Sequence, residues 1–425
     1  MLLDRSIAPV FHPIKDFAIT KANLHYLANR LPLYYIKAGE QEVASLQLLF
    51  SGGKWYEKQK GDAYFTAKMM LEGTLKHTAK QINEEFDFYG AFISCYGGYD
   101  KFFIDTHCLS KHLPNILDLI IELITEASFP KEEWQLVQKI ALQELQVNLE
   151  KNSFVAGQLF RKHIFGENHP YGYSLTEEMI ENFSLQRAKH HFQHFLLHQP
   201  FEIILAGKLD DKTFEQVKEK LGSLKINYST HFEGFNGKPE PSLQAKVYQE
   251  KKDASQTSLR IGMPIIHRNY TDKIPLQVLN EILGGYFGSR LMQNLREEKG
   301  YTYGIHSLIV SFLQESYFLI SADVIKEHKD KALEEIYKEI KLLKTQQVGE
   351  EELEKVKYHM AGDYIKSINT AFSLAEYFKT IHFQQLPQNY YDTYISKINS
   401  IKSSDILEVA NKYFKEENFI EVLVG

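Results

Sequence analysis

The stretch IENFSLQRAKHHFQHFLLHQPFEIILAG, residues 180–207, aligns without gaps on INSIKSSDILEVANKYFKEENFIEVLVG, residues 398–425. Each copy has a helical pattern followed by a short apolar run, which is typical of a buried strand. The offset between the copies is 218 in a chain of 425 residues. Four aligned pairs are identical: Ile180/Ile398, Phe201/Phe419, Leu205/Leu423 and Gly207/Gly425. A repeat at half the chain length indicates two copies of one unit.

The rest of the chain follows the same outline. SLQLLF, from Ser45, resembles SLRIGM, from Ser258, and each run precedes a helical pattern. Alternating apolar and polar residues predict adjacent strands near the start of the first copy. Helical spacing predicts helices over about 62–72, 131–161 and 184–198. Paired strands with helices grouped between them favour an α+β fold of two homologous halves, each an antiparallel or mixed sheet with helices packed on one face.

A linker is predicted between the two halves. Residues 226–244, INYSTHFEGFNGKPEPSLQ, are polar, contain Gly and Pro and show no period. Such composition is typical of a domain boundary. The predicted organisation is therefore an N-terminal half over 1–225, a linker over 226–244 and a C-terminal half over 245–425.

Composition excludes several classes of protein. With 49 Lys and Arg against 55 Asp and Glu, the net charge is −6, so a nucleic-acid partner is not expected. The two cysteines, Cys95 and Cys108, cannot build a disulfide framework and are interpreted as structural thiols. No signal or transit peptide is recognised in MLLDRSIAPVFHP, and LPNILDLIIELI is too short and too charged to span a bilayer. A cytoplasmic protein is therefore expected.

Most catalytic motifs are absent. The sequence has no nucleotide-binding glycine loop, no G-x-S-x-G, and no H-E-x-x-H or H-x-x-E-H among its 17 histidines. His190, His194 and His198 recur every four residues, which predicts one face of a helix. No carboxylate joins them, so a solvated face is the preferred interpretation over a metal site.

The most informative segment is LQVLNEILGGYFGSRLMQNLREEKGYTYGIHS, residues 276–307. It resembles the insulinase/pitrilysin family of zinc metallopeptidases, in particular the branch similar to the mitochondrial processing peptidase, with its pattern ILGG…SRL…RE..G..Y. SGGKWYEKQKGDAYFTAKMMLEGT, NHPYGYS and IILAGKLD extend the resemblance through the N-terminal half. The resemblance implies two α+β halves that together form a clam-shell chamber.

The zinc signature of that family is degenerate in this chain. The family's helix carries His-x-x-Glu-His before a G-T pair, and YFTAKMMLEGT stands there instead. Tyr64 occupies the first His position, Ala67 that of the general-base Glu, and Lys68 the second His. The third zinc ligand corresponds to Glu144, which lies 76 residues after Lys68. One carboxylate cannot hold a zinc ion, so no metal is expected in this half.

Lys68 suggests a replacement for the metal. Its ammonium could take the metal's place and pair with Glu144, because an unpaired buried Glu would be costly. The alternative is that both side chains are exposed and unrelated. The family's substrate-binding edge strand is also altered: Ser94 stands where Asn is usual, and Gly97-Gly98 weakens the strand pattern. A different mode of substrate binding is expected from this half.

The second part of the family's site is intact. Arg296 and Tyr303, seven residues apart, match the Arg and Tyr that reach the substrate near the zinc in active relatives. A guanidinium can grip a carboxylate or carbonyl, and a phenol can donate to a developing oxyanion. The alternative is that Arg296 caps its helix and Tyr303 packs in the sheet.

Two functions follow from the resemblance. In the first, the chain is the non-catalytic subunit of a heteromeric peptidase, inactive alone, that supplies Arg296 and Tyr303 in trans to a homologous H-x-x-E-H subunit. That partner would carry the zinc, the substrates would be peptides, and homo-oligomers remain possible. In the second, the chain is a scaffold without a role in catalysis. The intact pair favours the first, and the short GGYFG loop argues against mitochondrial presequence processing.

Overall fold

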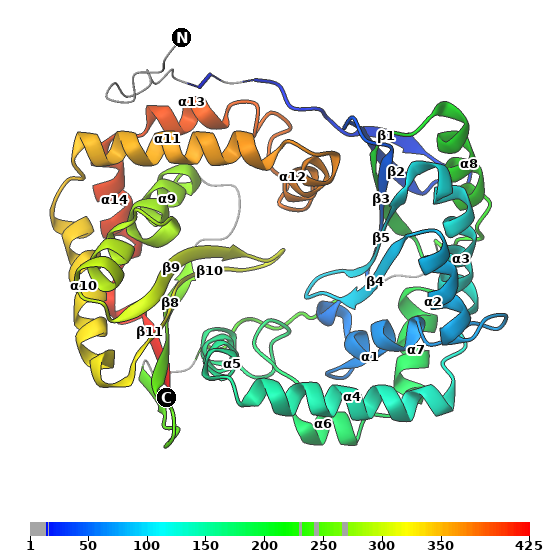
Figure 1. The fold of residues 1–425 in the computed structure, drawn as a ribbon, viewed down its shortest axis with the longest axis horizontal. Helices are drawn as coiled ribbons and strands as arrows, with labels where there is room; N and C mark the ends of the chain where they lie inside the picture. The colour runs from blue at the N-terminus through cyan, green and yellow to red at the C-terminus, as the bar shows by residue number, and fades with distance from the viewer. Residues whose placement is uncertain (1–13, 16, 229–231, 242–245, 266–270) are drawn as a thin grey trace, which may run out of the picture.

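Two sheets, each with its own group of helices, face one another across the molecule in a computed structural model (Figure 1). The structure describes residues 14–15, 17–228, 232–241, 246–265 and 271–425. Parts of the predicted linker, 229–231 and 242–244, and the N-terminal stretch 1–13 lie outside these residues. Within the described part of the chain, no helix is both long and apolar enough to cross a membrane.

The first half carries six strands and eight helices among the described residues. The strands are β1 (Asn23–Tyr26), β2 (Pro32–Lys37), β3 (Val43–Phe50), β4 (Phe92–Gly97), β5 (Phe102–Leu109) and β6 (Phe201–Gly207). The helices are α1 (Asp62–Met70), α2 (Ala79–Phe88), α3 (Leu113–Glu126), α4 (Lys131–Leu149), α5 (Asn152–Phe165), α6 (Glu177–Glu181), α7 (Leu185–Phe195) and α8 (Asp211–Gly222).

The second half repeats this order with local changes. Its strands are β7 (Lys246–Gln249), β8 (Gln256–Ile265), β9 (Thr302–Ser311), β10 (Ser316–Ile325) and β11 (Ile420–Val424). Its α-helices are α9 (Lys273–Asn280), α10 (Lys329–Thr345), α11 (Glu350–Ser367), α12 (Ala371–Phe383), α13 (Tyr394–Ser400) and α14 (Ser403–Tyr413). Two π-helical segments, η3 (Glu281–Gly285) and η4 (Met292–Glu298), precede β9.

Both sheets are mixed, as the sequence predicts. The first has the strand order β1-β2-β6-β3-β5-β4, and the second has β7-β11-β8-β10-β9. In each, one pair is parallel, β2 with β6 and β7 with β11, and the other pairs are antiparallel. Strands β4 and β9 take equivalent edges of the two sheets.

The repeated segments occupy equivalent places. Helix α7, Leu185–Phe195, and helix α14, Ser403–Tyr413, are offset by 218 residues at both ends, as the alignment requires. Each is followed by a central strand, β6 or β11. SLQLLF lies in β3 and SLRIGM in β8, which are the neighbours of those strands. The structure therefore shows the duplication inferred from the sequence.

Each half also sends one helix to the other half's sheet. Figure 1 shows α5 beside β8 and β11 of the second sheet, and α12 beside the first sheet. Successive side chains of a strand point to opposite faces of the sheet, so one sheet can pack against helices of both halves. Ile203 and Leu205 of β6 pack in the first half's own core, whereas Ile204 and Ala206 contact the cluster built with α12. The sequence predicts helices on one face of each sheet. The opposite face of each sheet is also covered, by a helix of the other half.

The exchanged helix α5 packs closely on the second sheet. The Phe160 ring is fully buried in a cluster with Tyr317, Val422 and Val424. A Cβ at Gly262 of β8 would lie 2.7 Å from the tip of that ring and closer still to the backbone oxygen of Phe318. Glycine at this position is therefore required chiefly by the backbone of the neighbouring strand β10, and it also leaves room for the Phe160 ring of the helix.

Two expectations about helices were wrong. The helix predicted over 131–161 is divided between α4 and α5, because the chain turns at Glu150 and Lys151 so that α5 reaches the other half. The helix predicted to reach residue 198 ends at Phe195, and His198 adopts a left-handed conformation with φ of 59°. The three histidines therefore do not share one helix face. The intervening His191 is buried and bonds to the carbonyl oxygen of Gly52 at 2.8 Å.

We predict that Phe160→Ala lowers the free energy of unfolding by about 3–5 kcal/mol, because the ring leaves a cavity between the two halves. Urea denaturation of both proteins measures the difference. Phe88→Ala removes a ring that is 80% exposed and serves as the matched control, with a change of about 0.5 kcal/mol or less. Equal effects of the two substitutions would contradict a structural role for the exchanged helix.

Candidate functional site

Helix α1 carries the positions that correspond to the zinc signature. Its start is fixed by Gly61, whose φ of 97° lies in the left-handed region that glycine readily adopts. The carboxylate of Glu57 accepts hydrogen bonds from the backbone nitrogens of Gly61 at 3.3 Å and Ala63 at 2.8 Å. A carboxylate at this end stabilises the helix through its free N–H groups and its dipole.

The structure brings Tyr64, Lys68 and Glu144 together. The Lys68 ammonium and the Tyr64 hydroxyl each lie 3.5 Å from the same oxygen, Oε2 of Glu144. Tyr64 and Lys68 are four residues apart and share a face of α1, and Glu144 projects from α4. The proposed pairing of Lys68 with Glu144 is therefore present.

This ion pair lies at the surface rather than in the interior. The side chains of Lys68 and Glu144 are 42% and 50% exposed, so solvent screens their attraction and a contribution below about 1 kcal/mol is expected. Burial, together with the nearby negative charge of Glu144, raises the pKa of Tyr64 to about 12. The phenol is therefore neutral at physiological pH and donates a hydrogen bond to the carboxylate.

The donor set at these positions does not fit a zinc ion. Tyr64 is held protonated, Lys68 is a cation, and Ala67 has no donor and is buried in the core of the first half. Glu144 is then the single oxygen donor, whereas zinc sites in proteins use three or four ligands. In the described residues, no three His, Cys, Asp or Glu side chains converge in a manner that could hold a metal ion.

The edge strand β4 runs past the same helix. Ser94 is exposed, and Gly97 is the last residue of the strand. A Cβ on Gly97 would lie 2.6 Å from the Cβ of Ala63, so the glycine allows the strand to touch the start of α1. The glycine that weakens the strand pattern in the sequence thus has a packing function.

Arg296 and Tyr303 lie in the second half, and no contact joins them to Lys68 or Glu144 within the described residues. Arg296 is part of η4, and Tyr303 is the second residue of β9. Tyr303 is 89% exposed, so it does not pack in the sheet. The Arg296 guanidinium lies 4.7 Å from the ring centre of Phe287 and 3.4 Å from the carboxylate of Glu297. The Tyr303 phenol is open to solvent, and the Arg296 side chain is 38% exposed.

Neighbouring residues hold this segment in place. Arg290 makes a bidentate ion pair with Glu352 of α11, with nitrogen–oxygen distances of 2.7 and 2.8 Å. The Asn294 amide donates to Glu335 and Glu339 of α10, at 2.8 Å each. The arginine of the SRL motif is therefore structural, and it anchors the element that carries Arg296.

Sequence reasoning missed a second acid–base pair. Glu281 of η3 lies 3.0 Å from Nδ1 of His359 on α11, beside a cavity of about 510 Å³. In chain order, α9 with η3 and α11 take the places of α1 and α4 in the first half. Glu281 and His359 therefore lie on the elements of the second half that correspond to those of Lys68 and Glu144 in the first half. The acidic residue is on the first element here, whereas in the first half it is on the second. Comparing the copies element by element could have found it.

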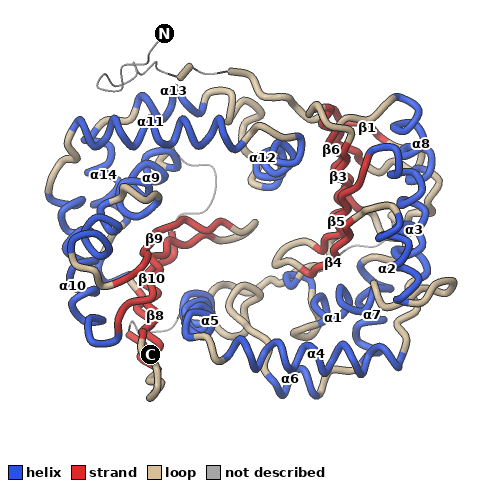
Figure 2. Tube along the Cα trace, viewed as in Figure 1, coloured by secondary structure: helices blue, strands red, loops and turns tan. Residues whose placement is uncertain are grey.

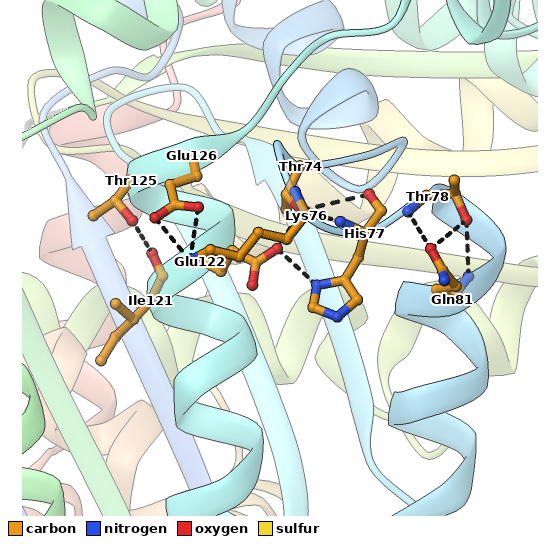
Figure 3. A network of polar contacts seen from close by, with 9 residues as sticks. All are labelled: Thr74, Lys76, His77, Thr78, Gln81, Ile121, Glu122, Thr125 and Glu126. Carbon is orange, nitrogen blue, oxygen red and sulfur yellow. Dashed lines mark hydrogen bonds and ion pairs between the residues drawn. The ribbon is translucent and has the colours of Figure 1, made fainter.

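A polar network fixes the turn that follows α1 (Figure 3). The buried Glu122 of α3 accepts a short hydrogen bond from the Thr74 hydroxyl and another from Nδ1 of His77 at 2.8 Å. Lys76 pairs with Glu126 one turn further along α3, and Thr78 caps α2 with Gln81. The network joins the end of α1 to α3 and α2.

This network predicts a pH dependence of stability. Burial favours a higher pKa for Glu122, but the hydrogen bonds from Thr74 and His77 outweigh it and hold the pKa below the ordinary value. Glu122 therefore stabilises the fold above its unfolded pKa, near 4.5, and this contribution is lost as the pH falls through the lower folded pKa.

We expect Glu122→Gln to reduce the free energy of unfolding at pH 7 by about 1 to 2 kcal/mol, with a smaller difference below pH 4. Urea unfolding at several pH values checks this. Glu84→Gln removes only an exposed ion pair with Lys80 on α2 and is the control, with a change of about 0.5 kcal/mol or less at either pH. A pH-independent effect of Glu122→Gln would contradict the assigned role of the carboxylate.

A second prediction concerns the vacant ligand positions. The double variant Tyr64→His, Lys68→His places two imidazoles beside Glu144, which completes a His–His–Glu ligand set. We expect it to bind one zinc ion per chain, as measured by metal analysis and cobalt absorption. Adding Glu144→Gln weakens binding by at least about tenfold. Because Ala67 still provides no general base, the zinc-loaded variant does not hydrolyse peptides. Failure of the double variant to bind zinc would mean that these helix positions do not converge as described.

Two models of one peptidase family match consecutive parts of the chain. Residues 34–176 match "Insulinase (Peptidase family M16)", and residues 182–359 match "Peptidase M16 inactive domain". A protein of Rickettsia bellii named as a zinc protease is 26% identical over 92% of this chain and 95% of its own. The zinc protease YmxG of Bacillus subtilis is 22% identical over 84% of this chain and 86% of its own.

Solved structures share the fold. A peptidase M16 inactive domain from Pseudomonas fluorescens has a TM-score of 0.83 at 21% identity and covers 95% of this chain and 97% of its own. A protease from Helicobacter pylori has a TM-score of 0.85 at 20% identity and covers 96% and 100%. Since the two family models together span most of both halves, the chain belongs to peptidase family M16, the insulinase family.

Proposed function

We propose that this chain is the non-catalytic subunit of a heteromeric metallopeptidase, in the processing-peptidase-like branch of the family. It is inactive alone and supplies Arg296 and Tyr303 to a composite active site. A homologous subunit with an H-x-x-E-H helix provides the zinc ion and the general base. The paired subunits process or degrade peptides.

The exposure of the Arg/Tyr pair carries this proposal. Tyr303 has the most exposed aromatic side chain among those described as exposed. Within the described residues, the Arg296 guanidinium contacts Phe287 and its neighbour Glu297. Tyr303 lies on a strand that is paired with β10, and its side chain points to solvent, so its hydroxyl is available to a ligand. The residues that surround the pair are fixed, whereas the two functional groups are free to contact a substrate.

The chemistry of the pair suits peptide hydrolysis. Zinc in the partner would supply the Lewis acid that activates water. Arg296 would grip a carbonyl or carboxylate of the peptide with two directed hydrogen bonds. The Tyr303 phenol would donate to the oxyanion of the tetrahedral intermediate, where a single donor is worth about 10²–10³ in kcat.

The degenerate positions support a division of labour. Tyr64, Ala67 and Lys68 leave Glu144 without fellow ligands, and the ion pair with Lys68 neutralises it. A half without a ligand set can still form a wall of a chamber. In this proposal, each subunit keeps one part of the active site: the partner keeps the zinc motif, and this chain keeps Arg296 and Tyr303.

Affinity purification of the tagged chain from its own cells, followed by mass spectrometry, tests the partnership. A similar-sized partner with H-x-x-E-H in equal amount supports it. Recovery of the chain alone, as a homo-oligomer, or with unrelated subunits of a membrane complex would replace it by the scaffold function without a role in catalysis.

In the reconstituted pair, Arg296→Ala and Tyr303→Phe are each expected to lower kcat/KM for a peptide by about 10²-fold. Tyr303→Phe acts mainly on kcat, because the hydroxyl donates to the transition state, and assembly measured by sedimentation stays unchanged. Lys299→Ala, an exposed change near Arg296, is the control and leaves the rate unaltered. Unchanged kinetics of both variants in an active pair would remove the pair from catalysis.

A further inference from the structure

A cavity of about 650 Å³ lies on the first half, beside Glu57 and the segment that leads into α1. The segment before α1 forms its floor, and the chain around Asn168, the end of α7 and the linker close its sides. The backbone nitrogens of Lys54 and Trp55 donate to the carbonyl oxygens of Gly98 and Tyr99, at 2.9 and 2.8 Å. Phe235 of the linker donates to the carbonyl of Trp55 at 2.7 Å, so three separate segments build the site.

The ammonium of Lys54 is the distinctive group of this cavity. It lies 4.4 Å from the ring centre of Tyr173 and 5.0 Å from that of Tyr99. Within the described part of the chain it makes no hydrogen bond and no ion pair. Burial lowers the pKa of Lys54 to about 8, and the repulsion of Arg161 acts in the same direction, against the attraction of Glu57. A largely buried ammonium that contacts only aromatic faces lacks an anion.

A second cation behind Lys54 is also incompletely paired. Arg161 projects from α5, and its Nε atom is buried without a hydrogen-bond partner among the residues that the structure describes. Buried polar groups are almost always paired in native structures. Lys54 makes no hydrogen bond and Arg161 has one unpaired N–H group within the described residues, so the two cations together create a positive potential in the cavity.

The nearest carboxylate is committed elsewhere. Glu57 receives a short hydrogen bond from the Tyr173 hydroxyl, in addition to those from the start of α1. Burial raises the pKa of Glu57 to about 7, despite these bonds and the charge of Lys54. Glu57 is therefore partly neutral near pH 7 and is turned toward the helix, so it does not fully compensate Lys54.

We propose that this cavity binds a small organic anion, a carboxylate or phosphate attached to a flat apolar body. The anionic group would meet the Lys54 ammonium at the floor. Lys58, Lys60 and His194 also line the cavity, and Glu233 adds one carboxylate. The Lys60 ammonium donates to the carbonyl oxygen of Glu167 and to the side chain of Asn168. The rings of Trp55, Tyr56, Phe195 and Phe235 line the remaining walls and would contact the apolar body.

A ligand in this cavity would contact residues that connect to two other parts of the molecule. Through Glu57 and Tyr173 the site contacts the start of α1, which carries Tyr64 and Lys68. The Tyr99 ring, which faces Lys54, also lies 4.7 Å from the ring of Phe312 at the turn between β9 and β10. A ligand would therefore stabilise both a helix of the first half and its contact with the second half.

Proton uptake provides a specific signature of such binding. An anion beside Lys54 raises its pKa, so at pH 8, where the amine is about half protonated, binding takes up as much as about half a proton. The other titratable or charged groups nearby are Glu57, Tyr99, Tyr173, Arg161, Lys58, Lys60, His194 and Glu233. Glu57 is mostly ionised at pH 8 and adds uptake chiefly near pH 7.

Calorimetric titration of the full chain with benzoate, phenyl phosphate and inorganic phosphate tests the proposal. We expect saturable binding of benzoate or phenyl phosphate, and the better probe identifies the anionic group. Benzoate titrations at pH 8, in two buffers of different ionisation enthalpy, should show proton uptake. Binding of inorganic phosphate as tightly as phenyl phosphate would overturn the role of the rings, and absence of saturable binding of all probes would overturn the site.

Lys54→Met keeps the length of the side chain and removes its charge. We expect it to weaken binding at least tenfold and to abolish most of the proton uptake, whereas Lys212→Met, an exposed change on α8, alters neither. If Lys54→Met does not fold, the wild-type protein still decides the question, because binding without proton uptake at pH 8 excludes Lys54 as the anion's partner. The inference is independent of the proposed peptidase partnership, since it is measured on the isolated chain.

Discussion

The exchange of α5 and α12 between the halves is the constraint on which the rest of the structure depends. Each sheet has two apolar faces, and its own helices cover only one of them (Figure 2). The second face is covered by a helix that belongs to the other half of the sequence. Because apolar strand faces are unstable in water, neither half is complete alone. The arrangement fixes the two halves relative to one another and so positions every group on their inner surfaces.

The helix that aligns with the family's zinc signature is held by contacts away from the aligned positions. Helix α1 keeps its glycine start, its Glu57 cap and its close contact with β4. What changes is the surface chemistry: a lysine and a tyrosine satisfy Glu144, which would otherwise stand alone as a metal ligand. The helix is therefore held in place by interactions at its start and on its buried face.

The second half is organised on the same plan but with different local geometry. Its counterpart of α1 continues into a π-helical segment, and a further π-helical segment carries Arg296. Such segments occur often at functional sites. Gly284 permits close contact with Ser307 of β9, so the ILGG motif aligns the strand that bears Tyr303 with the helix before it. Rigid surroundings with exposed functional groups are the arrangement expected of a surface that contacts a ligand.

The sequence by itself determined the duplication and the α+β class, and it identified the residues of α1 that align with the family's zinc signature. Repeated apolar periods and a constant offset survive sequence divergence, because they encode burial rather than contacts between particular residues. Other features depend on residues far apart in the chain, and only the tertiary structure decided them. It placed Lys68 against Glu144, paired Glu281 with His359, and exchanged α5 and α12 between the halves. It also left Lys54 and Arg161 without full partners. A periodic pattern says which face of an element is apolar, but it does not say which distant element covers that face or which charges are brought together as a result.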